Sequence, residues 1–163
     1  MIDLAVEELS GRVEDKRIGV WGAAFKLDSD DIRDSRALDV ASALHSRGAD
    51  VCVYDPEALD NARKKYPQLS YSSSAAEAAK GADLILHLTE WEEFQTLKLE
   101  SLEQIIRGKR IIDGRSALDP KRWRAAGWTF RALGRPEPVR SVRASAASDG
   151  EHRLSEDRQI QRQ

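Results

Sequence analysis

Hydrophobic residues along the chain gather into short runs that are separated by stretches of helical spacing. Five of these runs have the length and the β-branched content of buried strands. They cover Arg17–Gly22, Asp50–Asp55, Asp83–Thr89, Lys109–Gly114 and Trp128–Leu133, and a shorter extended piece covers Leu69–Ser74. The run at Asp83–Thr89 is apolar on both faces, which is typical of a central strand in a parallel sheet.

Apolar residues at helical spacing predict four helical segments around these strands. The first lies in residues 1–16, and the second follows Ser35, a favourable N-cap residue, and ends at Gly48. A polar helix covers Glu57–Tyr66, and an alanine-rich helical turn follows at residues 75–81. Alternating strands and helices indicate an α/β fold with a mostly parallel sheet covered on both faces.

The pattern divides the chain into three parts. Residues 1–15 form an N-terminal linker helix, residues 16–135 form the α/β domain, and residues 136–163 are a polar tail that we expect to be disordered. The apolar face of the first helix needs a partner, which is either this domain or something outside the chain.

Charge and composition narrow the classes of function. The formal net charge is −2, with 40% hydrophobic and 33% charged residues, which argues against a general role at nucleic acids or membrane surfaces. Cys52 is the single cysteine, so the chain forms no internal disulfide, in keeping with a reducing compartment. No apolar run reaches the ~18–20 residues of a membrane span. We expect a soluble cytoplasmic domain.

The first strand leads into the sequence "GVWGAAF", which we compared with a dinucleotide-binding fingerprint. This stretch contains only Gly19 and Gly22, and the next helix begins about a dozen residues later. Asp55 resembles the acidic residue that binds ribose in such folds, but it follows Gly22 by 33 residues instead of the usual ~20. The sequence therefore argues against an ordinary NAD-binding fold formed by this domain alone.

The long loop after the first strand, "GAAFKLDSDDIRDS", carries two cations, Lys26 and Arg33. At the carboxyl end of a parallel strand, such groups are well placed to bind a phosphate or a carboxylate. The alternative is that they pair with the aspartates of the same loop, Asp28, Asp30, Asp31 and Asp34. The aspartates lack the pattern of a calcium loop, so we expect no metal site there.

A second candidate cation, Arg115, follows a buried strand and Gly114. It should emerge at the same edge of the sheet as Lys26, and two cations from separate loops strengthen the case for an anion site. The alternative is a salt bridge from Arg115 to Asp113 or Asp119.

The remaining reactive or aromatic residues point to packing. In "TEWEEF" we assign Phe94 to the core and leave the role of Trp91 open. Cys52 lies within a strand and is expected to be buried and inert, and His87 to be packed. No Ser/His/Asp or Cys/His set has a recognisable spacing, so we predict no catalytic residue in this chain.

Four motifs together resemble the C-terminal UDP-binding domain of the UDP-glucose/GDP-mannose dehydrogenase family. They are "GAAFKLDSDDIRDSRALDV", "VYDP", "LTEWEEF" and "IIDGRSALDP", and the match runs from about Lys16 to Arg135. The resemblance implies a Rossmann-like three-layer sandwich. It is greatest to the UDP-glucose 6-dehydrogenase branch, whose enzymes oxidise UDP-glucose to UDP-glucuronate with NAD, through a thioester on a cysteine.

The resemblance also assigns roles to individual residues. It implies that Phe25, Lys26 and Arg115 contact the UDP-sugar and that Arg33 reaches toward NAD. The family's NAD-binding domain and its nucleophilic cysteine would precede Met1, and Cys52 does not take that role. The isolated chain would then bind a UDP-sugar without turnover. Its possible partners are a separate NAD-binding half and, through the first helix, a second copy of the chain.

Two alternatives to this function remain. One is a stand-alone, non-catalytic module from a truncated gene that binds nucleotide-sugars or a protein partner. The other is the same domain of a UDP-N-acetylmannosamine or GDP-mannose dehydrogenase.

Overall fold

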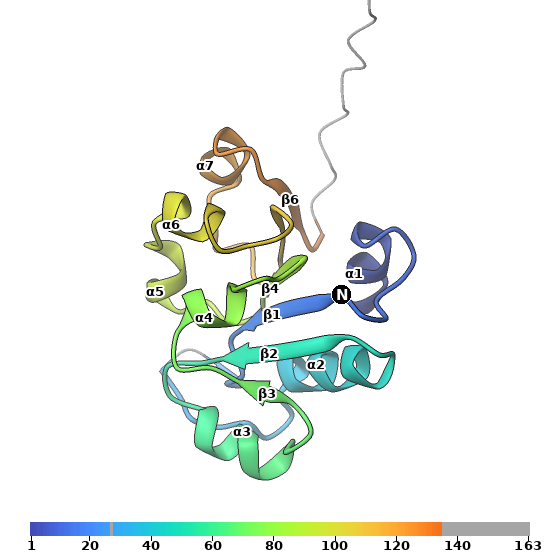
Figure 1. Ribbon diagram of the computed structural model, residues 1–163. Coiled ribbons are helices and arrows are strands. Elements are labelled where there is room, and N and C mark those ends of the chain that lie inside the picture. The colour runs from blue at the N-terminus through green and yellow to red at the C-terminus, as the bar shows by residue number, and fades with distance from the viewer. Residues whose placement is uncertain (27, 135–163) are drawn as a thin grey trace, which may run out of the picture.

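The computed structural model describes residues 1–26 and 28–134 (Figure 1). The tail of residues 136–163, which the sequence predicts to be disordered, lies outside the described residues. Six strands form one sheet: β1 (Arg17–Trp21), β2 (Asp50–Tyr54), β3 (Ser70–Tyr71), β4 (Leu84–His87), β5 (Arg110–Asp113) and β6 (Thr129–Ala132). Every predicted strand is confirmed, each shorter than predicted by one or more residues at one or both ends.

The sheet has the order β3-β2-β1-β4-β5-β6, and all of its strand pairs are parallel. In the central pairs, Gly19 lies opposite Cys52 on one side and Ile85 on the other. This is the strand order of a doubly wound Rossmann fold, so the predicted fold class is confirmed.

Seven helices lie in the described part of the chain. They are α1 (Ile2–Glu8), α2 (Arg36–Ser46), α3 (Leu59–Lys65), α4 (Ala75–Ala79), α5 (Glu92–Gln95), α6 (Leu99–Glu103) and α7 (Pro120–Ala125). The sequence pattern missed α5, α6 and α7, which have four to six residues each. Such segments are too short to establish a helical period.

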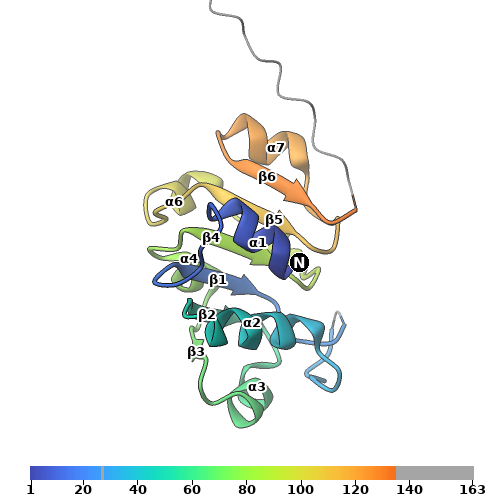
Figure 2. The ribbon, with the colours of Figure 1, turned by 90° about the vertical axis from the view of Figure 1, so that its right-hand side faces the viewer.

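The two faces of the sheet are packed differently. Helices α1 and α2 cover one face, while α4 lies on the other against β1 and β2 (Figures 1 and 2). The α4 face has an aromatic core, in which Trp21 stacks on Phe94 at 5.5 Å between ring centroids and lies 6.2 Å from Trp123. Gly19 of β1 lets α4 approach the sheet closely, because a Cβ at this position would lie 2.7 Å from the Ala78 carbonyl oxygen.

Helix α1 packs on its own domain. Its Ala5 and the following Leu9 are buried in the common core, and Arg131 of β6 lies 3.1 Å from a carboxylate oxygen of Glu7 and 3.2 Å from one of Glu8. Figure 2 shows α1 in front of the sheet, beside β4 and β5. The domain is therefore the partner of the apolar face that the sequence left unassigned.

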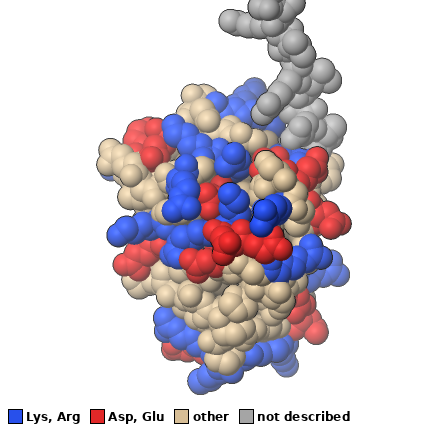
Figure 3. All heavy atoms as spheres, turned by 45° about the vertical axis from the view of Figure 1, so that its right-hand side comes forward, with Lys and Arg blue, Asp and Glu red and all other residues tan. Residues whose placement is uncertain are grey.

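The charged surface mixes both signs. On the face drawn in Figure 3, Lys and Arg side chains lie directly beside Asp and Glu. At the amino ends of the strands, Arg17 pairs with Asp50 at 2.6 Å and Lys109 with Glu103 at 3.2 Å. Of the helices in the described residues, none combines the length and the apolar character needed to cross a membrane.

Candidate functional site

The candidate site lies where the strands end, at the carboxyl edge of the sheet. Strand β1 lies between β2 and β4, and the chain leaves it toward α2 on one face but returns to β4 through α4 on the other. This divergence opens a crevice at the carboxyl ends of β1 and β4, which is the usual ligand position in doubly wound folds. The loop of Gly22–Ser35 begins there.

Asp55 organises the base of this loop. The backbone N–H groups of Ala23 and Ala24 donate to its Oδ2 at 2.8 and 3.0 Å, and the Trp91 indole N–H donates to the same oxygen at 3.1 Å. The N–H groups of Glu57 and Ala58 donate to Oδ1, each at 2.9 Å. The buried carboxylate thus ties together the segments that follow β1, β2 and β4.

Gly22 lets the chain turn out of β1. Its φ is +106°, a backbone conformation that favours glycine, and a Cβ there would lie 2.4 Å from Thr89 Oγ1. That hydroxyl instead donates to the Ala24 carbonyl at 3.2 Å. At the far end of the loop, Ser35 caps α2 by accepting from the Leu38 N–H at 3.2 Å and donates to the Ala23 carbonyl at 2.6 Å. Both ends of the loop are therefore fixed.

The middle of the loop presents Phe25 and Lys26 to solvent. Phe25 is 55% exposed, although its backbone N–H donates to the Asp31 carbonyl at 2.7 Å. Lys26 is also exposed and forms no ion pair with the described residues. An aromatic ring held in water next to a lysine offers a flat apolar surface and a positive charge to a ligand.

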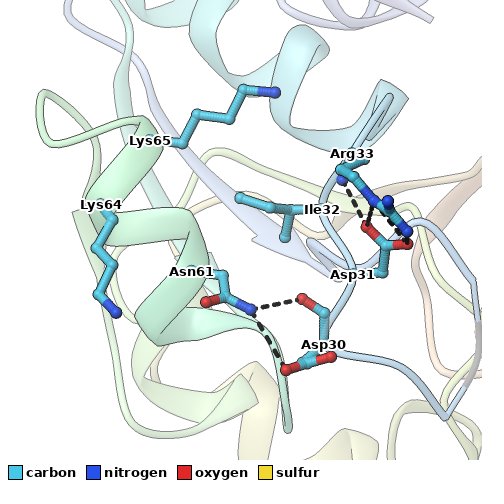
Figure 4. A pocket seen from close by; sticks show the side chains of 7 residues that line it. All are labelled: Asp30, Asp31, Ile32, Arg33, Asn61, Lys64 and Lys65. Atoms are coloured by element: carbon cyan, nitrogen blue, oxygen red, sulfur yellow. Dashed lines mark hydrogen bonds and ion pairs between the residues drawn. The ribbon is translucent and has the colours of Figure 1, made fainter.

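Arg33 pairs within the loop, as the alternative reading of the sequence predicts. Its guanidinium contacts Asp31 at 2.8 Å, and this hydrogen bond lowers the pKa of Asp31 to about 2. The Arg33 side chain is still 88% exposed. It lines a hollow of about 690 Å³ together with Asn61, Lys64 and Lys65 of α3 (Figure 4). Arg33 thus lies on the α3 side of the loop.

Arg115 pairs with a residue that the sequence did not suggest. Its Nε and Nη2 groups donate to the two carboxylate oxygens of Glu90 at 2.7 and 3.2 Å. The hydrogen bond lowers the pKa of Glu90 and raises that of Arg115. The alternative partners considered for this side chain, Asp113 and Asp119, were wrong. Asp113 accepts the backbone N–H of Arg115 instead, at 2.9 Å.

A buried pair lies beneath this surface pair. His87 Nδ1 lies 2.8 Å from Asp113 Oδ1, and both side chains are fully buried. The Leu118 N–H donates to the other Asp113 oxygen at 2.9 Å. Burial by itself raises the pKa of Asp113, but the hydrogen bonds from His87, Leu118 and Arg115 outweigh it and lower the pKa. Two side-chain pairs thus join the ends of β4 and β5: the buried pair of His87 and Asp113 and the surface pair of Glu90 and Arg115.

Two observations limit the chemistry of the site. A second hollow, of about 420 Å³, is lined by Asp28, Ser29, Asp30, Glu57 and Trp91 and is acidic. No three or more His, Cys, Asp or Glu groups in residues 1–26 and 28–134 are arranged to hold a metal ion. Cys52 is buried within β2, and burial raises its pKa, so its thiol is not an activated nucleophile.

These residues do not form a cradle for NAD. All five hydrogen bonds accepted by Asp55 come from the protein, so this carboxylate is not available to bind a ribose hydroxyl. Helix α2 begins only at Arg36, so no helix N-terminus follows β1 closely enough to receive a pyrophosphate.

The sequence predicted the cations of the site but not the residues that hold their loops and side chains in place. Phe25, Lys26 and Arg115 all lie at the carboxyl edge, whereas Arg33 lies toward α3. Glu90 went unnoticed inside "TEWEEF", and Trp91, whose role was open, is a buried donor to Asp55. Phe94, His87 and Cys52 are buried as predicted. The acidic residue directly after the central strand was the signal that could have revealed Glu90.

Comparisons with known proteins agree with this geometry. Residues 19–120 match the UDP-glucose/GDP-mannose dehydrogenase family, UDP binding domain. UDP-glucose 6-dehydrogenase AglM of Haloferax volcanii is 42% identical over 123 residues, which is 73% of this chain but 28% of that enzyme. The chain thus spans little more than a quarter of this relative.

Solved structures of two different dehydrogenases resemble the fold. A UDP-glucose dehydrogenase from Pyrobaculum islandicum has 31% identity and a TM-score of 0.66, over 80% of this chain and 28% of that one. A UDP-D-ManNAc dehydrogenase from Pyrococcus horikoshii has 28% identity and a TM-score of 0.65, over 82% of this chain and 29% of that one. With the matched motifs and the crevice at β1 and β4, these findings show that the chain belongs to the UDP-glucose/GDP-mannose dehydrogenase family, as its C-terminal UDP-binding domain.

Proposed function

We propose that this domain holds the UDP part of the substrate in an NAD-dependent UDP-glucose 6-dehydrogenase that converts UDP-glucose to UDP-glucuronate. In this proposal Phe25, Lys26 and Arg115 contact the nucleotide. The observation that carries it is the exposed Phe25–Lys26 pair on a loop whose base is fixed by Asp55. A ligand that binds there meets an aromatic surface and a cation on a loop whose two ends are already fixed by hydrogen bonds.

The charges around the edge favour one position for the diphosphate. Lys26 and Arg115 attract it, while the acidic hollow with Asp28, Asp30 and Glu57 repels it. The phosphates therefore lie toward β4 and β5, and Phe25 is left to contact the uracil ring.

Arg33 has a different role in the proposal. Its guanidinium is highly exposed on the α3 side of the loop, away from Glu90 and Arg115. We assign it to NAD held by another part of the enzyme. NAD supplies the hydride acceptor when bound, and this domain contributes the orientation of the sugar nucleotide.

In this proposal, hydride transfer and the nucleophilic cysteine belong to the part of the enzyme that lies outside the region matched by this chain. We also propose that this domain works together with an NAD-binding half. In this proposal the complete enzyme is cytoplasmic and forms a homodimer. This chain alone should bind UDP and UDP-glucose but reduce no NAD. Turnover by this chain alone would contradict the assignment.

A second candidate is the same domain in a dehydrogenase for another sugar nucleotide. The nearly equal TM-scores for a UDP-glucose and a UDP-D-ManNAc dehydrogenase favour keeping it. We infer that this domain binds the nucleotide and that other parts of the enzyme select the sugar. Equal affinities for UDP-glucose and UDP-N-acetylmannosamine would support this division, and a large preference would place sugar selection here.

Calorimetric titration tests the nucleotide site. Phe25→Ala and Lys26→Ala should each weaken UDP binding by roughly 10- to 100-fold, the range expected for losing a charged hydrogen bond or an aromatic contact. Leu133→Ala is a matched control for Phe25, because Leu133 is 47% exposed and follows β6, which β4 and β5 separate from β1. Lys80→Ala, at the opposite edge of the sheet, is the control for Lys26. Equal effects of the variants and their controls would reject the site.

A further inference from the structure

The ion pair between Arg115 and Glu90 has a geometry that leaves one edge of the guanidinium available. An arginine has five N–H donors, two of which Glu90 engages, one on Nε and one on Nη2. The end of the guanidinium, formed by Nη1 and the second Nη2 hydrogen, donates no hydrogen bond to the described residues. This end has the fork geometry that binds two phosphate oxygens at once.

Both residues of the pair stand on fixed backbone. Glu90 lies between Thr89 and Trp91, and these buried side chains donate to Ala24 and Asp55 respectively. The backbone N–H of Arg115 donates to Asp113, whose carboxylate also binds His87. The pair therefore links the β4 and β5 loops from two fixed backbone positions, although both of its side chains reach the surface.

Glu90 has two possible effects on an anionic ligand, with opposite signs. Its charge repels a phosphate and competes for Arg115, but its hydrogen bonds also hold the long arginine side chain in one direction. Because Glu90 occupies the Nε edge and leaves the end of the fork open, the orienting effect should dominate.

We propose that Glu90 is a positioning residue that aims the free end of the Arg115 guanidinium at the ligand's diphosphate. This inference rests on the proposed function, in which Arg115 contacts the nucleotide. It adds a reason why an acidic residue belongs in an anion site: it restricts the arginine to the orientation that binds.

The test is a double-mutant cycle on the full chain with two ligands, UDP and uridine. We expect Glu90→Ala to weaken UDP binding by roughly 5- to 30-fold, with no change for uridine, which has no phosphate. In an Arg115→Ala background, the same substitution should no longer weaken UDP binding, because the group that Glu90 orients is gone, and the loss of a charge that repels the phosphates acts in the opposite direction. Glu100→Ala, an exposed glutamate on α6, is the control.

The outcomes separate this inference from the proposed function. If Arg115→Ala leaves UDP affinity unchanged, the assignment of Arg115 to the nucleotide is wrong and the inference falls with it. If Arg115→Ala weakens UDP binding but Glu90→Ala strengthens it or leaves it unchanged, the assignment stands and the inference is overturned. Equal losses for UDP and uridine would show that Glu90 only maintains the fold.

Discussion

At the scale of single residues, the carboxylates of this domain act mainly as acceptors for backbone N–H groups at strand ends. Asp55 accepts four such groups and one indole N–H, and Asp113 accepts two, together with its contact to His87. Buried carboxylates are stable only with full hydrogen bonding, and both of these meet that condition. Loop geometry at the carboxyl edge therefore depends on very few side chains.

Replacing Asp55 with asparagine tests this dependence. The amide turns one acceptor oxygen into a donor that faces N–H groups, so we expect Asp55→Asn to lower the free energy of unfolding by about 2–4 kcal/mol. Urea denaturation followed by circular dichroism measures the change. Asp60→Asn, whose side chain is 89% exposed on α3, should stay within about 0.5 kcal/mol of the wild type. Equal stabilities of both variants would contradict the role given to Asp55.

The pair formed by Asp31 and Arg33 makes a second prediction at this scale. Because the Arg33 hydrogen bond lowers the pKa of Asp31 to about 2, Arg33→Ala should raise that pKa toward 3.8. A ¹³C NMR titration of the side-chain carboxyl follows this value directly. Arg63→Ala, which removes an arginine of α3, should leave Asp31 unchanged. A titration near 3.8 in the wild type would mean that the pair does not persist in solution.

At the scale of elements, the sheet brings together loops that are distant in the chain. Glu90 and Arg115 are 25 residues apart, but β4 and β5 are hydrogen-bonded neighbours, so the loops that follow them meet. The loop after β1 joins them through Thr89 and Ala24. The candidate site is therefore a property of strand order, with one cation delivered by each of two loops.

Helix α1 provides a prediction about which part of the chain forms the domain. Leu9, directly after α1, is 5% exposed in the common core, so Leu9→Ala should lower the free energy of unfolding by about 2–4 kcal/mol. Asp3→Ala, an exposed change on the same helix, is the control. Thermal and urea unfolding that show no loss for Leu9→Ala would mean that α1 is docked only weakly on the sheet.

At the scale of the whole molecule, two kinds of side chain with shifted pKa values limit the pH range in which the fold is stable. The carboxyl pKa values of Asp31, Glu77, Glu90 and Asp113 are lowered by hydrogen bonds. Burial and a hydrogen bond to Glu93 raise the phenol pKa of Tyr54 to about 12, and burial raises that of Tyr71 to about 12. The first set favours the ionised form in the fold, and the second favours the neutral form.

The sign of each contribution follows from linkage between protonation and folding. Stability from the carboxyl groups is fully present above about pH 5 and is lost as the pH falls through their lowered folded-state values. Stability from the tyrosines is present below about pH 9 and is lost as the pH rises toward 12. We therefore expect thermal unfolding between pH 2 and 11 to show a plateau between about pH 5 and 9. A midpoint that rises steadily from pH 7 to pH 3 would contradict this prediction.

Local patterns in the sequence were sufficient for most of the fold. Five apolar runs and one short extended piece located the six strands, Ser35 marked the start of α2, and the motifs around Phe25, Lys26 and Arg115 indicated the family. The short helices α5, α6 and α7 escaped because fewer than two turns leave no readable period and, unlike the equally short α4, they carry no run of alanines.

The sequence by itself determined which segments become strands and which residues carry charge at the carboxyl edge, because both depend on neighbours along the chain. Only the tertiary structure decided which charges pair. Asp31 pairs with Arg33, while Lys26 stays exposed. The Arg115 side chain pairs with Glu90 and not with Asp113 or Asp119. Helix α1 packs on the sheet of its own domain. Ion pairs and docked faces depend on distance in space, which the order of the strands sets and which no local pattern contains.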